Sequence, residues 1–123
     1  MYLLKQEFYT IYSRNKGEDH LTVNLQFNFN HKIFKGHFPN QPVVPGVCML
    51  QIIKEQVSEY LNIPLILEST GQLKFINSII PNQADYYTFN IIFKENTINL
   101  LKVDASIIAG EQTYFKGILS FKK

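Results

Sequence analysis

The sequence predicts an α+β domain in which a curved antiparallel β-sheet wraps around one central α-helix. Three observations lead to this prediction. Apolar and polar residues alternate strictly over residues 21–29, as in a half-buried strand. Residues 46–61 have the apolar spacing of a helix. Four further segments, rich in β-branched and aromatic residues, follow this helix and are separated by turn residues.

The N-terminal part of the chain is expected to form a β-hairpin. Residues 2–13 are aromatic and β-prone, and residues 15–19 have the composition of a turn. The alternating strand at residues 21–29 comes next, and its apolar side chains are expected to face the core. A proline-bearing loop then leads to Pro45.

The predicted helix begins at Pro45 and Gly46 and ends before the sequence Asn62-Ile63-Pro64. Its apolar stripe consists of Met49, Leu50, Ile53, Val57 and Tyr60, and the opposite face carries Gln51, Lys54, Glu55, Ser58 and Glu59. Val47, Cys48 and Ile52 are apolar as well, so the first turns are expected to be enclosed by protein.

Four strands are expected after the helix, at residues 72–80, 86–93, 98–108 and 113–121. Short turns at residues 81–83, 95–96 and 110–111 separate them. This order predicts a four-stranded meander, which would complete the sheet around the helix.

Composition favours a folded protein with one domain, residues 1–123. Hydrophobic residues make up 46% and charged residues 18%, which excludes disorder as the main state. The net charge of +2 does not provide the clustered basic surface of a nucleic-acid-binding protein. No apolar run reaches the length of about 18 residues that a membrane span needs, and the N-terminal apolar segment is too short for a signal peptide. We therefore expect a cytoplasmic protein.

The chain has a single cysteine, Cys48, so it cannot form an internal disulfide. We expect Cys48 to act as a small buried hydrophobic residue. No spacing of cysteine and histidine resembles a zinc site, so we expect no metal and no cofactor.

The most informative segment is residues 36–47, Gly-His-Phe-Pro-Asn-Gln-Pro-Val-Val-Pro-Gly-Val. Prolines fix the backbone on one side of His37, and glycines allow close backbone approach. A neutral imidazole is available near pH 7, because the ordinary pKa of histidine is about 6.5. The segment therefore places a candidate general base, His37, in a stiff loop before a helix.

This segment resembles the signature of the bacterial 3-hydroxyacyl-[acyl carrier protein] dehydratases. The matching residues are Phe34, Gly36, His37, Phe38, Pro39, Pro42, Pro45 and Gly46, with a fainter likeness at Lys74, Phe75 and Pro81. The resemblance implies the hot-dog fold. It also implies removal of water from 3-hydroxyacyl thioesters on an acyl carrier protein, giving trans-2-enoyl thioesters in fatty acid or polyene-type lipid or pigment biosynthesis.

In this family's chemistry, His37 would take a proton from the carbon next to the thioester carbonyl. Backbone N–H groups near Gly46 and Val47, at the start of the helix, would then receive the charge that develops on the thioester oxygen. We expect Phe38, Pro45 and Val47 to contact the substrate.

The resemblance fails at one position, because the family has a carboxylate five residues after the glycine of Pro-Gly and this chain has Gln51 there. An amide donates a hydrogen bond or holds a water, but supplies no proton at neutral pH. Three alternatives remain open: His37 both removes and returns the proton, Glu55 or Glu68 acts as the acid, or Gln51 positions a water. If neither glutamate is the acid, we expect Glu55 and Glu68 to be solvated surface residues.

The resemblance further implies a substrate tunnel at a dimer interface, in which His37 of one chain faces Gln51 of the other. We expect a homodimer, or a heteromer with a second hot-dog subunit, and an acyl carrier protein with a phosphopantetheine-linked acyl chain as partner. Four lysines are either contacts for that acidic partner or ordinary solvated residues: Lys32, Lys35, Lys54 and Lys74.

Two other functions remain as alternatives. The first is a non-catalytic partner subunit that binds the acyl carrier, which Gln51 favours because the acid is missing. The second, ranked lower, is a hot-dog acyl thioesterase.

Overall fold

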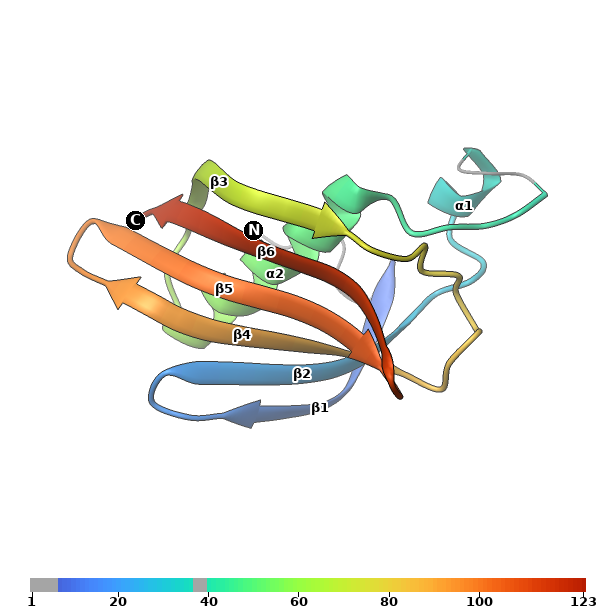
Figure 1. The fold of residues 1–123 in the computed structure, drawn as a ribbon, viewed down its shortest axis with the longest axis horizontal. Helices are drawn as coiled ribbons and strands as arrows, with labels where there is room; N and C mark the ends of the chain where they lie inside the picture. The colour runs from blue at the N-terminus through green and yellow to red at the C-terminus, as the bar shows by residue number, and fades with distance from the viewer. Residues whose placement is uncertain (1–6, 37–39) are drawn as a thin grey trace.

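The computed structural model describes residues 7–36 and 40–123, and these form one six-stranded antiparallel sheet with two helices (Figure 1). The elements in chain order are β1 (Tyr9–Lys16), β2 (His20–Phe27), α1 (Ile33–Gly36), α2 (Gly46–Leu61), β3 (Ile66–Phe75), β4 (Tyr87–Asn96), β5 (Leu100–Ala109) and β6 (Gln112–Lys122).

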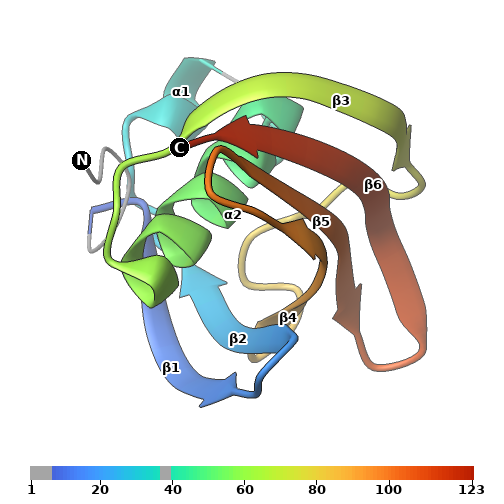
Figure 2. The same cartoon turned by 90° about the vertical axis from the view of Figure 1, so that its left-hand side faces the viewer.

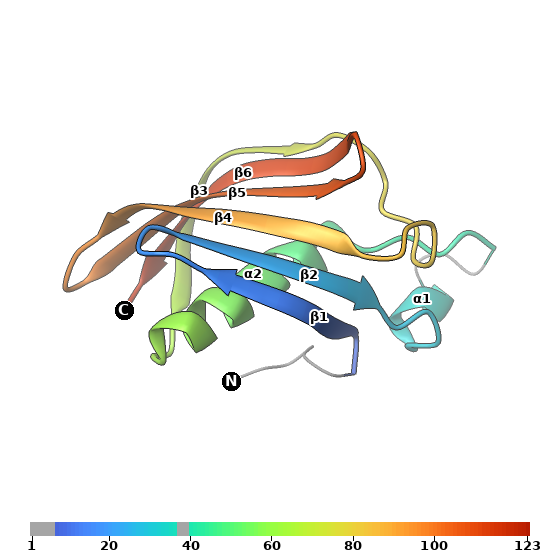
Figure 3. The same ribbon diagram turned by 90° about the horizontal axis from the view of Figure 1, so that it is seen from below.

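The sheet curls around α2, which lies along its concave side (Figure 2). The strand order is β1-β2-β4-β5-β6-β3, so β1 and β3 are the two edges. The short helix α1 lies off one end of the sheet, beyond the first turn of α2 (Figures 1 and 3). The predicted architecture of a curved antiparallel sheet around one helix is therefore confirmed.

The prediction of a four-stranded meander after the helix was wrong. Strands β4, β5 and β6 do form a meander, but β3 pairs with β6 instead of β4. Residues 76–86 lead from the edge strand β3 past the ends of β6 and β5 to β4. Local apolar patterns identify strands but not their partners, so this crossing could not be predicted from the sequence.

Four strand boundaries also differ from the prediction. Residues 15–16 and 95–96, which were expected in turns, are paired at the ends of β1 and β4. Strand β3 begins at Ile66 and ends at Phe75, whereas residues 72–80 were expected. Strand β2 ends at Phe27, and Phe29, expected to face the core, is 46% exposed. The reason is a turn at this point, in which Asn28 Oδ1 accepts a hydrogen bond of 3.1 Å from the Asn30 N–H.

Helix α2 spans the residues that the sequence predicted. At its C-terminal end, Asn62 adopts the left-handed conformation, with φ of 56°. The N–H of Ile63 donates to Ser58 O at 3.2 Å, and the N–H of Asn62 donates to Glu59 O at 3.3 Å. These two bonds form a Schellman motif, which satisfies carbonyls that the helix end would leave unpaired.

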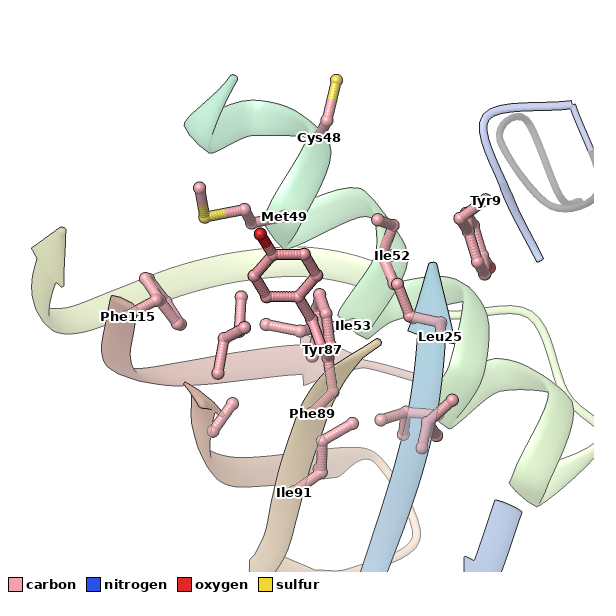
Figure 4. Close-up of a cluster of buried hydrophobic side chains, with 14 of the residues drawn as sticks. Tyr9, Leu25, Cys48, Met49, Ile52, Ile53, Tyr87, Phe89, Ile91 and Phe115 are labelled. Atoms are coloured by element: carbon pink, nitrogen blue, oxygen red, sulfur yellow. The ribbon is translucent and has the colours of Figure 1, made fainter. Parts of the chain in front are cut away.

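The core lies between α2 and the concave face of the sheet. Figure 4 shows side chains of α2 packed against those of the strands. The buried residues in this view include Leu25, Met49, Ile52, Ile53, Phe89, Ile91 and Phe115. Each fully buried side chain of this kind stabilises the fold by about 1.5–3 kcal/mol, so α2 is held by its packing more than by its own helix propensity.

The expectation that protein encloses the first turns of α2 is confirmed for Cys48 and Ile52, which are buried, and is wrong for Val47, which is 75% exposed. Within residues 7–36 and 40–123, none of the helices has the length and apolar character to cross a membrane.

Candidate functional site

The candidate base His37, together with Phe38 and Pro39, lies outside the described residues. The chain on both sides of this segment is anchored to the core. On the N-terminal side, the Phe34 ring is buried and stacks on Phe8, with 5.2 Å between the ring centroids. On the C-terminal side, the Val44 N–H donates to Ile79 O at 2.9 Å.

The described loop then leads into the first turn of α2. Pro45 precedes this turn in an extended conformation, with φ of −63° and ψ of 144°, and no side chain in the described part of the chain caps the helix. The N–H groups of Gly46 and Val47 have no partner within the helix, as at any helix start. They are therefore suited to receive negative charge from a ligand.

Gly46 packs closely against Phe75, which is 51% exposed and whose ring would have to move if position 46 carried a side chain. A Cβ at this position would lie 2.8 Å from Cε1 of the Phe75 ring, which is closer than such atoms approach in proteins. The ring of Phe75 therefore lies directly against the backbone of the first turn. A glycine here serves both this packing and the access of a ligand to the backbone.

An apolar cleft of about 680 Å³ opens beside this turn. One wall is the start of α2, and the other is the end of β3 with the residues that follow it. Its lining includes Pro45, Gly46, Val47, Leu73, Phe75 and Ile76. A cleft of this volume and apolar character fits a hydrocarbon chain. It brings together three of the predicted site residues, Pro45, Gly46 and Val47.

Gln51 lies one turn further along α2 and is half-buried. It lines a smaller cavity of about 200 Å³, to which Lys54 and Leu67 also contribute. Val47 and Leu50 line both this cavity and the larger cleft. Gln51 is thus adjacent to the cleft that its neighbours line, but is not part of its wall.

The expectation that Glu55 is solvated at the surface was wrong, because its exposed fraction is 0%. Gln51 Nε2 donates to Glu55 Oε2 at 2.8 Å, and the Tyr9 hydroxyl donates to Glu55 Oε1 at 2.9 Å. Gln56 Nε2 in turn donates to the Tyr9 oxygen at 3.0 Å. Tyr9 of β1 therefore reaches Glu55, and Arg14 of the same strand pairs with Glu59 at 2.7 Å, so part of the polar side of α2 faces protein rather than water.

The other carboxylate, Glu68, is exposed on β3, as expected of a surface residue, and lines neither cavity. The four lysines lie on or beside three different elements: Lys32 and Lys35 at α1, Lys54 on α2 and Lys74 on β3. Among the residues that the structure describes, no group of three or more histidine, cysteine or acidic side chains is placed to hold a metal ion.

Burial alters the chemistry of two side chains, Cys48 of α2 and Tyr9 of β1. Burial, and then the negative charge of Glu55, raises the pKa of the Cys48 thiol. Cys48 therefore stays protonated near pH 7 and behaves as the small buried residue that was expected. Burial also raises the pKa of Tyr9, although its hydrogen bond from Gln56 opposes the shift.

Sequence reasoning missed the side chains that join Glu55 to β1. The spacing of Gln51 and Glu55 places them one turn apart on the same face of a helix, and this signal was recognised. Tyr9 and Gln56 carried no signal, because β1 lies far from α2 in the sequence and only the folded sheet brings Tyr9 to the helix. Leu73 and Ile76, which line the cleft, were also missed.

Comparison with known proteins adds three findings. The family model described as ApeI-like, ApeI dehydratase, matches residues 13–116. A 3-hydroxyacyl-[acyl-carrier-protein] dehydratase, FabZ, of Streptococcus uberis is 26% identical over 98 residues, which cover 74% of this chain and 70% of the relative.

Among solved structures, the dehydratase heterocomplex ApeI:P from Xenorhabdus doucetiae matches with a TM-score of 0.75 and 20% identity, over 93% of this chain and 97% of the matched chain. A hypothetical thioesterase with coenzyme A from Streptococcus pneumoniae matches with a TM-score of 0.66 and 11% identity, over 93% of this chain and 84% of that one. At these identities the structural matches show a shared hot-dog fold.

Proposed function

Because the chain belongs to the ApeI-like dehydratase family, we propose that it removes water from 3-hydroxyacyl thioesters on an acyl carrier protein and forms trans-2-enoyl thioesters. The observation that carries this proposal is the apolar cleft beside the uncapped start of α2. The cleft suits an acyl chain, and the helix start suits the oxygen of its thioester. A polyene-type lipid or pigment pathway, or fatty acid synthesis, would use such a product.

The reaction begins when the neutral imidazole of His37 removes a proton from C2 of the substrate. The electron pair moves toward the thioester carbonyl, and the N–H groups of Gly46 and Val47 stabilise the charge on its oxygen. The C3–O bond then breaks as the electrons return to form the C2–C3 double bond. Phe38, Pro45 and Val47 contact the acyl thioester in this scheme.

The departing hydroxyl needs a proton to leave as water. Gln51 cannot supply it, because an amide is not an acid at neutral pH. Both carboxylate oxygens of Glu55 already accept hydrogen bonds, from Gln51 and Tyr9, and Glu55 lines neither cavity. We therefore assign the proton return to His37, which carries the proton that it took from C2.

The exposed apolar residues beside the cleft support an assembly of two hot-dog subunits. Val47 and Phe75 line the cleft and are 75% and 51% exposed. Strand β3 is an edge of the sheet, and Ile66 at its start is 64% exposed. An unpaired edge strand with apolar neighbours favours pairing with another chain. The partner is a second copy or a related hot-dog subunit, and the matched ApeI:P structure is such a heterocomplex. The single cysteine suits a cytoplasmic location.

To test the function, 3-hydroxyacyl thioesters on an acyl carrier protein are incubated with the wild type or with His37→Ala. The mass of the carrier-bound acyl group is then measured by mass spectrometry. We expect the wild type to remove one water and His37→Ala to remove none. Glu95→Gln is the matched control, because this exposed carboxylate near the end of β4 lines neither cavity, and it should act like the wild type. Release of the free acid would instead identify a thioesterase.

A second function is favoured by one observation, the amide at position 51. A subunit that only binds the acyl carrier would tolerate this loss of the acid. In that case, the wild type would leave the substrate unchanged when alone, and Gln51→Glu would begin to remove water.

A further inference from the structure

We propose that Glu55 is a positioning residue that fixes the side-chain amide of Gln51, so that Gln51 presents its carbonyl oxygen, Oε1, toward the reacting hydroxyl. This proposal rests on the proposed dehydratase function and adds a residue to its site. Three hydrogen bonds and the burial of Glu55 carry the argument.

The hydrogen bonds all run toward Glu55. The Tyr9 oxygen accepts a hydrogen bond from Gln56 Nε2, and the single hydroxyl hydrogen of Tyr9 is directed at Glu55 Oε1. Gln51 Nε2 donates to the other oxygen, Oε2, at 2.8 Å. A carboxylate accepting at both oxygens accommodates the N–H side of an amide and repels its carbonyl side.

This arrangement selects one of the two orientations of the Gln51 amide. If the amide were turned over, its Oε1 would face Glu55 Oε2 at hydrogen-bond distance, with no hydrogen between two acceptors. Since Nε2 is turned toward the buried carboxylate, Oε1 is left for the half-buried side of Gln51, where the smaller cavity lies. The smaller cavity adjoins the larger cleft, because Val47 and Leu50 line both. With the acyl thioester in the larger cleft, Gln51 accepts a hydrogen bond from the 3-hydroxyl group of the substrate where it enters the smaller cavity, or from the water that departs.

The burial of Glu55 supports a functional role. A carboxylate with no exposed surface is costly for the fold, even when hydrogen bonds offset much of the cost. An apolar residue at this position would fill the space between α2 and β1 without that cost. Departures of this kind from the rules of core composition concentrate at functional sites.

The proposal predicts that Glu55 acts only through Gln51, and a double-mutant cycle tests this. Dehydration rates are measured for wild type, Gln51→Ala, Glu55→Gln and the double variant. We expect Glu55→Gln to lower kcat by about tenfold to a hundredfold, the usual effect of losing a charge-assisted hydrogen bond, with KM within about twofold. In the Gln51→Ala background, the same substitution should have no further effect.

Equal losses in both backgrounds would overturn the proposal, because Glu55 would then act as the acid itself or only through stability. Ser58→Ala is the matched control for stability. Ser58 is also a buried polar residue of α2, but it donates to Ile63 O at the far end of the helix. It should lower the melting temperature while kcat stays within about twofold of the wild type.

A second measurement needs neither turnover nor a folded variant. In nitrogen-15 NMR spectra of the wild type, the Gln51 Nε2 protons should exchange slowly with solvent, because one of them is held by the buried carboxylate. Exchange at the rate of an exposed glutamine would overturn the proposal, whatever the activity. A wild type that removes no water from any carrier-bound substrate would overturn the proposed function alone, because the exchange rates would still decide the orientation of Gln51.

Discussion

The buried tyrosines show how position in the fold sets the chemistry of a single side chain. The Tyr87 hydroxyl donates to Ile80 O at 2.8 Å, and the ring is fully buried. Burial, followed by the neighbouring Tyr114, raises the pKa of Tyr87 to about 12. Because the ordinary pKa of tyrosine is about 10, the folded protein holds this proton more tightly than the unfolded chain does.

This shift predicts a loss of stability in alkaline solution. A folded-state pKa above the unfolded value gives stability that is complete below about pH 10 and is lost as the pH rises toward 12. A shift of about two units corresponds to about 2–3 kcal/mol in the free energy of unfolding. The free energy of unfolding, measured with urea from about pH 9 to about pH 12, should fall less steeply with pH for Tyr87→Phe than for the wild type. Equal slopes for the two proteins would contradict the shift.

Glu55 marks the limit of sequence reasoning at the scale of the residue. The spacing placed Glu55 on the same helix face as Gln51, and this was correct. Its solvation was wrong, because a helix pattern separates polar from apolar faces but does not show what covers the polar one. The cover is β1 with Tyr9, and that contact depends on the whole sheet.

Among the elements, α2 was predictable and β3 was not. The boundaries of α2 are encoded locally, by Pro45 and Gly46 at its start and Asn62 at its end. No local pattern identifies the partner of β3. It pairs with β6 because residues 76–86 lead past β6 and β5 before β4 begins. The same crossing brings Phe75 to the start of α2, so the site could be located in the sequence but its second wall could not.

The C-terminal end of α2 gives a prediction at this scale. Asn62 has φ of 56°, a conformation that costs most residues about 1 kcal/mol or more and costs glycine almost nothing. Asn62→Ala should therefore lower the free energy of unfolding by about 1 kcal/mol, whereas Asn62→Gly should preserve or raise it. Urea unfolding of the two variants measures the difference. An alanine variant as stable as the glycine variant would show that the Schellman motif does not stabilise this helix.

At the scale of the whole molecule, the cleft is bordered by surface that one chain leaves exposed. The start of α2 and the edge strand β3 carry exposed apolar residues, among them Val47, Ile66 and Phe75. A second hot-dog subunit along β3 would cover these residues and extend the sheet. The family resemblance implied a dimer, but the edge strand that we propose for its interface can be identified only once the strand order is known.

A pair of isoleucines tests this assembly. Ile66→Lys places a charge on the exposed edge strand and should convert a dimer into monomers in sedimentation velocity. Ile98→Lys is the matched control, because Ile98 is 88% exposed in the turn between β4 and β5, and it should leave the dimer intact. A dimer that survives Ile66→Lys would place the interface elsewhere.

The proposed mechanism requires His37 to exchange a proton with C2 of a carrier-bound acyl chain, and this exchange can be followed in the reverse reaction. A trans-2-enoyl thioester on an acyl carrier protein is incubated with the enzyme in deuterium oxide and then returned to ordinary water. The mass of the carrier-bound product is measured by mass spectrometry. The wild type should add the elements of one water, with deuterium on C2 and ordinary hydrogen on the back-exchanged C3 hydroxyl, because the base delivers a solvent-derived hydrogen to C2. His37→Ala should add neither, and a His37→Ala protein that hydrates as fast as the wild type would contradict the mechanism.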